Sequence, residues 1–156
     1  GLWLGCPALL CFPFFILRGD RIIVGEVRGG EAFDMMQCLN TGHDGSMSTG
    51  HANSARDMLS RLENMILMGM EIPLTAIRQQ IASGIDIIVH LGRLRDKSRK
   101  VLEIVEVTGY EDGEIQLAPL YRFEEEGETA EGKLRGNLRK KGELGYVEKL
   151  QSAGLW

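Results

Sequence analysis

This sequence lacks an excess of positive charge, an even set of cysteines and internal repeats. Its net charge is -4, whereas nucleic-acid binders carry clustered Lys and Arg, so nucleic acid is not an expected partner. Its three cysteines, Cys6, Cys11 and Cys38, are odd in number and show no C-x-x-C spacing. Neither a disulfide framework nor a zinc site is therefore predicted, and a reducing cytoplasm is the expected compartment.

A charge-free apolar run opens the chain and covers residues 1–17. A membrane-spanning helix needs about 20 apolar residues, and this run is shorter and contains Pro7 and Pro13, which disrupt helices. It also lacks the basic start and the cleavage site of a secretory signal. We expect an atypical hydrophobic leader, buried or aberrant in origin, and a membrane anchor is the alternative. A start at Gly1 further suggests a fragment or a displaced reading frame.

From Arg21 onward, strand and helix patterns alternate as in an α/β protein. A narrow strand and a polar loop are expected within residues 43–54, where Gly, Ser and His prevail. The apolar side chains of the helices, including the methionines at 58, 65, 68 and 70, are expected to form the core. The other segments are a buried strand over 21–26 and helices over about 32–41, 54–69 and 73–83.

The second half of the chain predicts antiparallel strands. Three runs rich in β-branched residues, 85–94, 99–110 and 114–123, are separated by the turn-forming sequences RDKS and EDG. Together they predict a β meander. After Phe123 the sequence turns acidic and then basic, which is typical of a solvated loop or hairpin, and a short amphipathic helix is expected at the C-terminus.

Glu26 follows an apolar strand, Ile22 to Val24, and is the first candidate for chemistry. In proteins that cleave nucleoside triphosphates, a strand beside the nucleotide ends in an acid that holds Mg²⁺ or orients the attacking water. A glutamate that simply ends a strand at a loop is the structural alternative.

The segment GEVRGGEAFDMMQCLNTGHDGSMSTGHANSARDMLSRLE resembles the type II/IV secretion ATPase superfamily, and most closely its Flp/Tad pilus-assembly (CpaF-like) branch. The resemblance covers residues 18 to about 123 and continues through IRQQIASGIDIIVHLGRLRDKSRKVLEIVEVTG. RIIVGEVRG resembles the Walker B motif of that family, and NTGHDGS with STGHANS resembles its His box.

The resemblance implies roles for named residues. Glu26 would polarise the attacking water, directly or through a Mg²⁺-bound water, and Arg28 would be a supporting charge. His43 and particularly His51 would lie near the γ-phosphate. The structural alternatives are a cap at the C-terminal end of a helix for His43 and an ordinary loop residue for His51. No other metal ligand is implied. Thr49 is a further nucleotide-binding candidate, since a small residue there lets the backbone approach the phosphate. Arg61 and Arg78 are candidates for arginines that reach the nucleotide of a neighbouring subunit. The structural alternative for both arginines is a surface ion pair.

The chain departs from the family in one respect, since it contains no phosphate-binding loop of the form G-x-x-x-x-G-K-[ST]. Residues 1–17 also do not resemble the family's preceding segment, which suggests a truncated gene or a frameshift. The implied fold is the C-terminal part of a RecA-like P-loop ATPase domain, a partial parallel sheet with flanking helices, plus the antiparallel meander. The expected divisions are the leader, the partial RecA-like domain over 18–123, and a charged loop with a short helix over 124–156.

Two functions follow from this resemblance. The chain is the C-terminal portion of a hexameric ATPase for pilus assembly or secretion, inactive alone, with ATP and Mg²⁺ as the implied cofactors. Alternatively it is a non-enzymatic ring-interface or adaptor module that modulates a full-length ATPase. In either case the implied partners are identical or full-length subunits and inner-membrane platform proteins, and the expected location is cytoplasmic and peripheral to the membrane.

Overall fold

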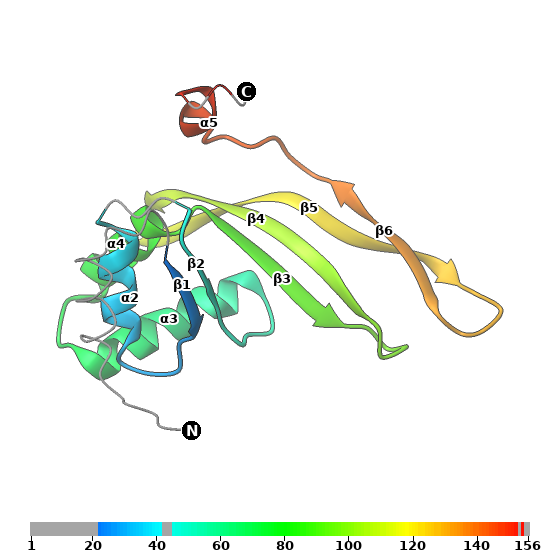
Figure 1. Cartoon of the computed structure of the whole chain (residues 1–156), viewed down its shortest axis with the longest axis horizontal. Helices are drawn as coiled ribbons and strands as arrows, with labels where there is room; N and C mark the ends of the chain where they lie inside the picture. Colours follow the sequence, from blue (N-terminus) through cyan, green and yellow to red (C-terminus); the bar gives the residue numbers. More distant parts are fainter. Residues whose placement is uncertain (1–21, 42–44, 153, 155–156) are drawn as a thin grey trace. The chain divides into compact units, whose positions relative to one another are not determined.

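The structure is a computed structural model that describes residues 22–41, 45–152 and 154 (Figure 1). It divides into two compact units. Unit 1 comprises the chain up to residue 52 together with 56–84, and unit 2 comprises residues 53–55 and 85–156. Both a parallel and an antiparallel sheet are present, which confirms the predicted mixture of helices with two kinds of sheet.

Unit 1 combines two short parallel strands with helices. Strand β1 (Ile23–Glu26) pairs with β2 (Met47–Thr49) in parallel. The helix α2 (Ala32–Leu39) connects them in sequence, as a parallel pair requires. The helices α3 (Ala55–Gly69) and α4 (Leu74–Gly84) follow. The predicted strand–helix alternation is therefore confirmed in this part of the chain.

The core of unit 1 is formed by one stripe of each helix. Met36 of α2, Ile66 of α3 and both Ile77 and Ile81 of α4 are fully buried. The prediction that Met68 and Met70 belong to this core was wrong, because both are exposed. At about 100° per residue, Met68 projects from the side of α3 opposite to the stripe that contains Ile66.

The two-stranded sheet leaves an apolar face open. Ile23 and Met47 are partners in the β1–β2 register, and their side chains are 73% and 60% exposed. The expected buried strand over 21–26 is thus only partly right, since Ile22 is buried but Ile23 is not. A parallel sheet is ordinarily covered on both faces, and within the described residues this one is left open at Ile23 and Met47.

A further expectation concerns the N-terminal part of the chain. The leader over residues 1–17 lies outside the described residues. Within the described segments, no helix combines the length and apolar character needed to span a membrane.

Unit 2 is a four-stranded antiparallel meander in the order β3-β4-β5-β6, whose first three strands were predicted. Its hairpin turns include Asp112–Gly113 between β4 and β5, where both residues have positive φ and the sequence signalled a turn. The charged stretch after Phe123 forms the end of β5 and then β6, so the hairpin is the correct alternative to the loop. The elements are β3 (Ile87–Arg93), β4 (Arg99–Glu111), β5 (Glu114–Glu128), β6 (Leu134–Lys140) and the short helix α5 (Glu148–Ser152).

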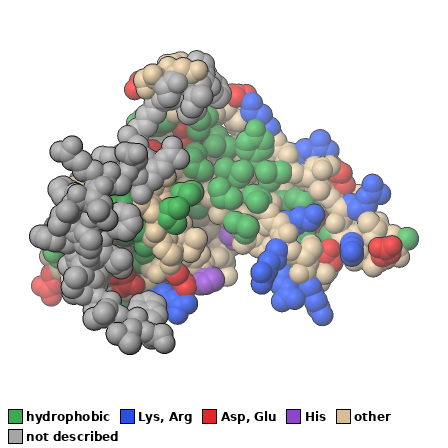
Figure 2. Space-filling model, viewed as in Figure 1, with side chains coloured by type: hydrophobic (Ala, Val, Ile, Leu, Met, Phe, Trp, Pro, Cys, Tyr) green, Lys and Arg blue, Asp and Glu red, His purple; other side chains and the backbone are tan. Residues whose placement is uncertain are grey.

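Side-chain types are segregated over this sheet. Hydrophobic side chains gather over its strands, and Lys and Arg side chains gather toward the ends of its hairpins (Figure 2). The buried apolar residues of the sheet include Val105, Val107, Ile115 and Leu120. Along β3, exposed positions alternate with half-buried ones, and no residue of the strand is fully buried.

Glu106 of β4 is a charged residue inside this apolar layer, with only 2% of its surface exposed. Its Oε2 accepts the Gly145 N–H at 2.9 Å and its Oε1 accepts the Tyr146 N–H at 2.8 Å. Both oxygens of one buried carboxylate therefore hold the segment that leads into α5. A buried charge requires such partners, because leaving it unsatisfied is costly.

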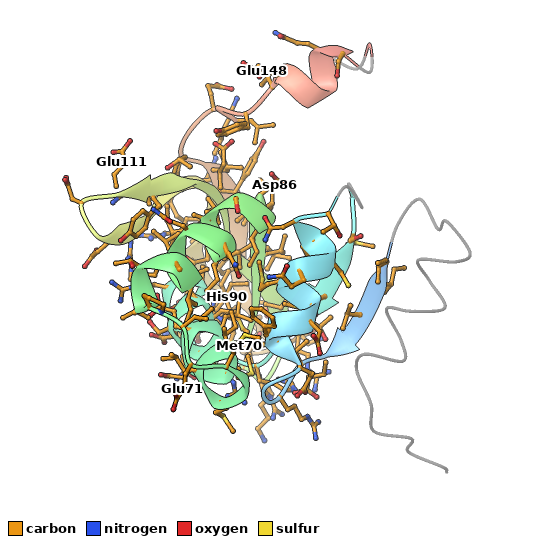
Figure 3. The ribbon with its side chains drawn as sticks, turned by 90° about the vertical axis from the view of Figure 1, so that its left-hand side faces the viewer. Met70, Glu71, Asp86, His90, Glu111 and Glu148 are labelled. Carbon is orange, nitrogen blue, oxygen red and sulfur yellow. The ribbon has the colours of Figure 1, made fainter. Side chains whose placement is uncertain are left out.

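We predict that Glu106→Gln releases the C-terminal segment. The amide retains one acceptor and directs an N–H₂ group at a backbone N–H, so one buried hydrogen bond is lost, at a cost of about 2 kcal/mol in unfolding free energy. Hydrogen exchange of the Gly145 and Tyr146 amides should accelerate. The matched control is Glu111→Gln, an exposed glutamate at the end of the same strand (Figure 3), and equal effects of the two changes would contradict the proposed role of Glu106.

Candidate functional site

The candidate site lies at the carboxyl end of the parallel strands of unit 1. Glu26 is the last residue of β1 and is paired in register with Thr49, the last residue of β2. The carboxyl ends of parallel strands are where α/β folds place their ligand sites. The chain leaves β2 through Gly50 and His51, so the pairing brings His51 to the same edge as Glu26.

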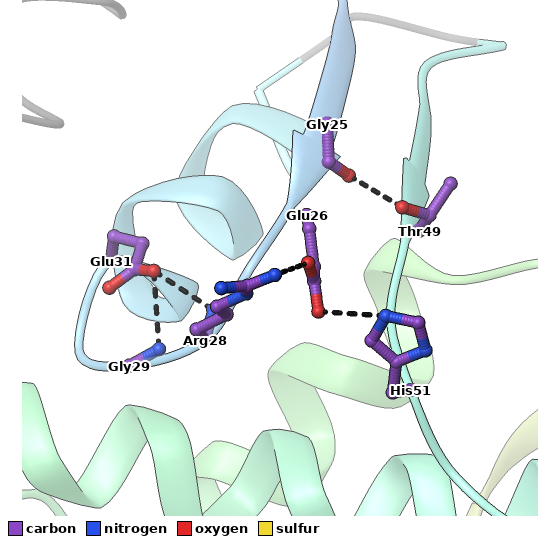
Figure 4. A network of polar contacts seen from close by, with 7 residues as sticks. All are labelled: Gly25, Glu26, Arg28, Gly29, Glu31, Thr49 and His51. Carbon is purple, nitrogen blue, oxygen red and sulfur yellow. Dashed lines mark hydrogen bonds and ion pairs between the residues drawn. The ribbon is translucent and has the colours of Figure 1, made fainter. Parts of the chain in front are cut away.

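Both carboxylate oxygens of Glu26 are engaged (Figure 4). The Arg28 Nη2 donates to Oε2 at 2.5 Å, and the His51 Nε2 lies 3.2 Å from Oε1. The Glu26 side chain is 22% exposed, whereas those of Arg28 and His51 are largely exposed. The three residues predicted to be catalytic therefore lie together. Arg28 and His51 both contact the Glu26 carboxylate, and their own side chains are open to solvent.

The electrostatics of this cluster favour an ionised Glu26. The hydrogen bond from Arg28 is the main cause that lowers the pKa of Glu26; desolvation opposes it, and electrostatic interactions with Arg28, His51 and Arg61 lower it further. The same pair raises the pKa of Arg28. The carboxylate consequently keeps its negative charge at neutral pH, as a group that orients water by accepting its proton must.

The loop that carries Arg28 is shaped by Glu31, which the sequence analysis did not identify. Its Oε1 accepts the backbone N–H groups of Arg28 at 2.9 Å and Gly29 at 3.2 Å. These hydrogen bonds lower the pKa of Glu31. No sequence signal pointed to Glu31, because its partners are backbone N–H groups that precede α2.

Close glycine packing fixes the other side of this loop. A Cβ on Gly30 would lie 2.9 Å from the Gly69 Cα at the end of α3. No side chain fits at that distance, so both positions require glycine for steric reasons. The end of α3 thus sets the path of the loop and, through it, the position of the Arg28 side chain.

The remaining predicted site residues divide into near and distant groups. The Thr49 hydroxyl donates to the Gly25 carbonyl at 2.9 Å, and so ties β2 to β1. Arg61 of α3 is near enough for its charge to act on Glu26. Arg78 instead forms two hydrogen bonds with the Glu63 carboxylate, at 2.9 and 3.3 Å, as in the ion-pair alternative. His43 lies outside the described residues.

His90 is not part of this cluster. It lies on β3 in unit 2, and its Nδ1 is 3.8 Å from the Glu103 Oε1. Both side chains are mostly covered. This is the environment of a packed histidine, in agreement with the structural role expected from its place in an apolar strand.

The arrangement can orient water and attract anions but cannot enclose a metal by itself. No group of three or more His, Cys, Asp or Glu side chains in the described part of the chain could hold a metal ion. The positive side chains around Glu26 fit a phosphate group, because charge-assisted hydrogen bonds from Arg are strong and geometrically specific. A single carboxylate fits a metal only when a water or phosphate oxygens supply the other ligands.

Comparison with known proteins identifies relatives of the chain. Residues 15–137 match the type II/IV secretion system protein family. The conjugal transfer protein TrbB of Rhizobium radiobacter is 37% identical over 114 residues, which cover 73% of this chain and 34% of TrbB. The type IV secretion system protein PtlH of Bordetella pertussis is 39% identical over 98 residues, which cover 60% of this chain and 28% of PtlH.

A solved structure is also similar. The VirB11 ATPase from the Brucella suis type IV secretion system, crystallised in complex with sulphate, superposes with a TM-score of 0.60 and 31% sequence identity. The match covers 64% of this chain and 31% of that protein. The chain thus spans about a third of the length of the relatives it matches.

We predict that Arg28→Gln raises the pKa of Glu26 toward its ordinary value of 4.5, because the hydrogen bond that chiefly lowers it is weakened. The stability contributed by this pair is present above that ordinary value and is lost as pH falls through the lowered pKa of Glu26. A carbon-13 NMR titration of the Glu26 carboxyl measures the shift. Arg61→Gln is the control, expected to raise the pKa less, and an unchanged titration in Arg28→Gln would refute the assignment.

Proposed function

Because the chain belongs to the type II/IV secretion system protein family, we propose that it is the C-terminal portion of a hexameric ATPase that powers secretion or pilus assembly. The proposal divides the chain into a leader over residues 1–17, a partial RecA-like domain over 18–123 and a C-terminal extension over 124–156. The observation that carries the proposal is the Glu26 carboxylate held between Arg28 and His51 at the end of a parallel strand.

The proposed chemistry is transfer of a phosphoryl group to water. ATP bound with Mg²⁺ supplies that group. Such reactions depend on positioning and on charge stabilisation more than on covalent catalysis. Glu26 orients the attacking water by accepting a hydrogen bond from it, and the lowered pKa of Glu26 keeps its carboxylate ionised for that role. Arg28 holds the carboxylate in place until a phosphate competes for its guanidinium.

The neighbouring residues are assigned according to their distance from Glu26. His51, whose Nε2 lies 3.2 Å from the Glu26 carboxylate, faces the terminal phosphate in the proposed site, and His43 has only the role that the His-box resemblance implies. Thr49 maintains the backbone that approaches the phosphate, since its hydroxyl is used between the strands. Arg61 adds positive charge near Glu26. Arg78 contributes only if its pair with Glu63 opens toward a neighbouring subunit.

The site is proposed to be inactive in this chain alone. No G-x-x-x-x-G-K-[ST] sequence is present to hold the β- and γ-phosphates and to supply a lysine and a Mg²⁺ ligand. The cluster around Glu26 provides only the water-orienting side of a nucleotide site. Turnover therefore depends on a phosphate loop from the rest of the ATPase.

We assign the parent protein to the Flp/Tad pilus-assembly branch on the basis of the two resembling segments, residues 25–63 and 77–109. Its partners are subunits of the same ring and platform proteins of the inner membrane, and its location is cytoplasmic and peripheral to that membrane. The relatives described above are named for conjugal transfer and type IV secretion. The choice of pilus assembly over secretion therefore depends on the resemblance of those two segments alone.

We predict that Glu26 is required for turnover once a phosphate loop is supplied. In a chimera, residues 22–152 replace the matching region of the Brucella suis VirB11 ATPase, and Mg²⁺-dependent phosphate release from ATP is measured. Glu26→Gln should lower the rate by about 10²- to 10⁴-fold, the usual contribution of a positioned base. Glu114→Gln, an exposed acid on β5, is the control, and an active Glu26→Gln chimera would refute the proposed role.

The second candidate function is a non-enzymatic ring-interface module, which the absence of a phosphate loop favours. Adding the purified chain to a full-length relative should change that relative's ATPase rate in a concentration-dependent way if mixed rings form. Glu26→Gln should leave this effect unchanged if the chain acts only through an interface. No effect at a large molar excess of the chain would exclude the interface function.

A further inference from the structure

The β3–β4 hairpin concentrates positive charge in a chain that is acidic as a whole. Residues 93–100 contain five Lys or Arg residues and one Asp, whereas the net charge of the chain is -4. Arg93 stands directly opposite Arg99 in the register of the two strands. Like charges at opposed positions destabilise a hairpin, so the arrangement favours a function other than folding.

The acidic groups near this hairpin are already engaged. The Asp96 carboxylate accepts the Ser98 N–H at 2.9 Å, the Ser98 hydroxyl at 2.6 Å and the Leu134 N–H at 2.8 Å. Glu125 and Glu128 pair with Arg95 at 3.4 and 2.8 Å. Among the described residues, no acid forms an ion pair with the other four cations, which are Arg93, Lys97, Arg99 and Lys100.

An apolar stripe continues from this charge along the same face of β3. Ile87, Val89 and Leu91 alternate along the strand and are 40%, 47% and 64% exposed. Arg93 is the next residue in this alternation, so it projects from the same face as the stripe. One side of the strand therefore presents three aliphatic side chains followed by the cationic end of the hairpin.

We propose that the β3–β4 hairpin docks on an anionic lipid bilayer. The cations contact phosphate headgroups, and the aliphatic stripe enters the boundary between headgroups and acyl chains. The stripe favours a bilayer over a nucleic acid. The phosphates of either partner can bind the cations, but only a bilayer also offers an apolar region to the aliphatic side chains. The proposal specifies a surface for the membrane-peripheral location proposed above, and it does not depend on the nucleotide site.

The test uses the full chain and lipid vesicles. Hydrogen exchange is followed segment by segment with vesicles of phosphatidylglycerol and phosphatidylcholine, and with vesicles of phosphatidylcholine alone. Segment-level detection is needed because residues 1–17 are apolar and uncharged and could bind either kind of vesicle. The expected result is protection of residues 87–101 by the anionic vesicles only, and its loss at about 1 M salt, where screening is strong.

Variants separate the two parts of the surface. The double change Arg93→Gln and Arg99→Gln should weaken anionic-vesicle binding by about 10- to 30-fold, since each cation near such a surface contributes about fivefold. Leu91→Ser should weaken it by about tenfold through lost apolar contact. The matched control is Lys133→Gln with Arg135→Gln, which removes the same charge from exposed positions by the β5–β6 turn and should leave binding within about twofold.

Several outcomes would overturn the proposal. Equal weakening by the hairpin pair and the control pair would show that only net charge matters. Equal protection of residues 87–101 by neutral vesicles would show that the cations take no part, and no protection at residues 87–101 would exclude the hairpin as the contact. Binding of RNA at this hairpin with higher affinity than vesicles, unaffected by Leu91→Ser, would identify a phosphate-backbone site instead. Since no nucleotide is used, failure here leaves the ATPase proposal untouched.

Discussion

The parallel pairing of β1 with β2 is the constraint on which the candidate site depends. Glu26 and His51 are separated in sequence by α2 and by β2, and only this register brings them within 3.2 Å. The Thr49 hydroxyl bonded to the Gly25 carbonyl reinforces the pairing at the residue next to Glu26. A slip of the register would move His51 along the edge and leave one oxygen of Glu26 without its partner.

Each of the two units uses a carboxylate to hold a segment distant in sequence, but under opposite conditions. Glu106 is buried, so its hydrogen bonds to Gly145 and Tyr146 act without competition from water. Glu26 meets its partners at the surface, where solvent weakens every ion pair. The first arrangement suits a permanent attachment. The second can exchange one partner for another, which is what a site that admits a phosphate requires.

The sequence predicted the elements better than it predicted their exposure. Strand and helix periodicity located β1, α3 and the meander, because those patterns are local. The exposure of Ile23 and Met68 was missed, since it depends on how many strands and helices are present to cover a face. The meeting of Glu26 with Arg28 and His51 came from a family resemblance, and no spacing rule contains it. Glu31 and Glu106 were missed because their partners are backbone N–H groups, which leave no pattern in the side-chain sequence.

The open apolar face of the β1–β2 sheet and the exposed ion pairs of Glu26 have a common physical meaning. Ile23 and Met47 would be covered in a complete parallel sheet, and the same covering structure would exclude water from the adjoining strand ends. Charges stabilise a transition state strongly only where water is excluded. A phosphate loop carried on an adjacent strand would supply both the cover and the phosphate contacts. Under the proposed function, the solvent-exposed cluster at Glu26 therefore becomes a closed site only together with a phosphate loop and strand that the described residues do not contain.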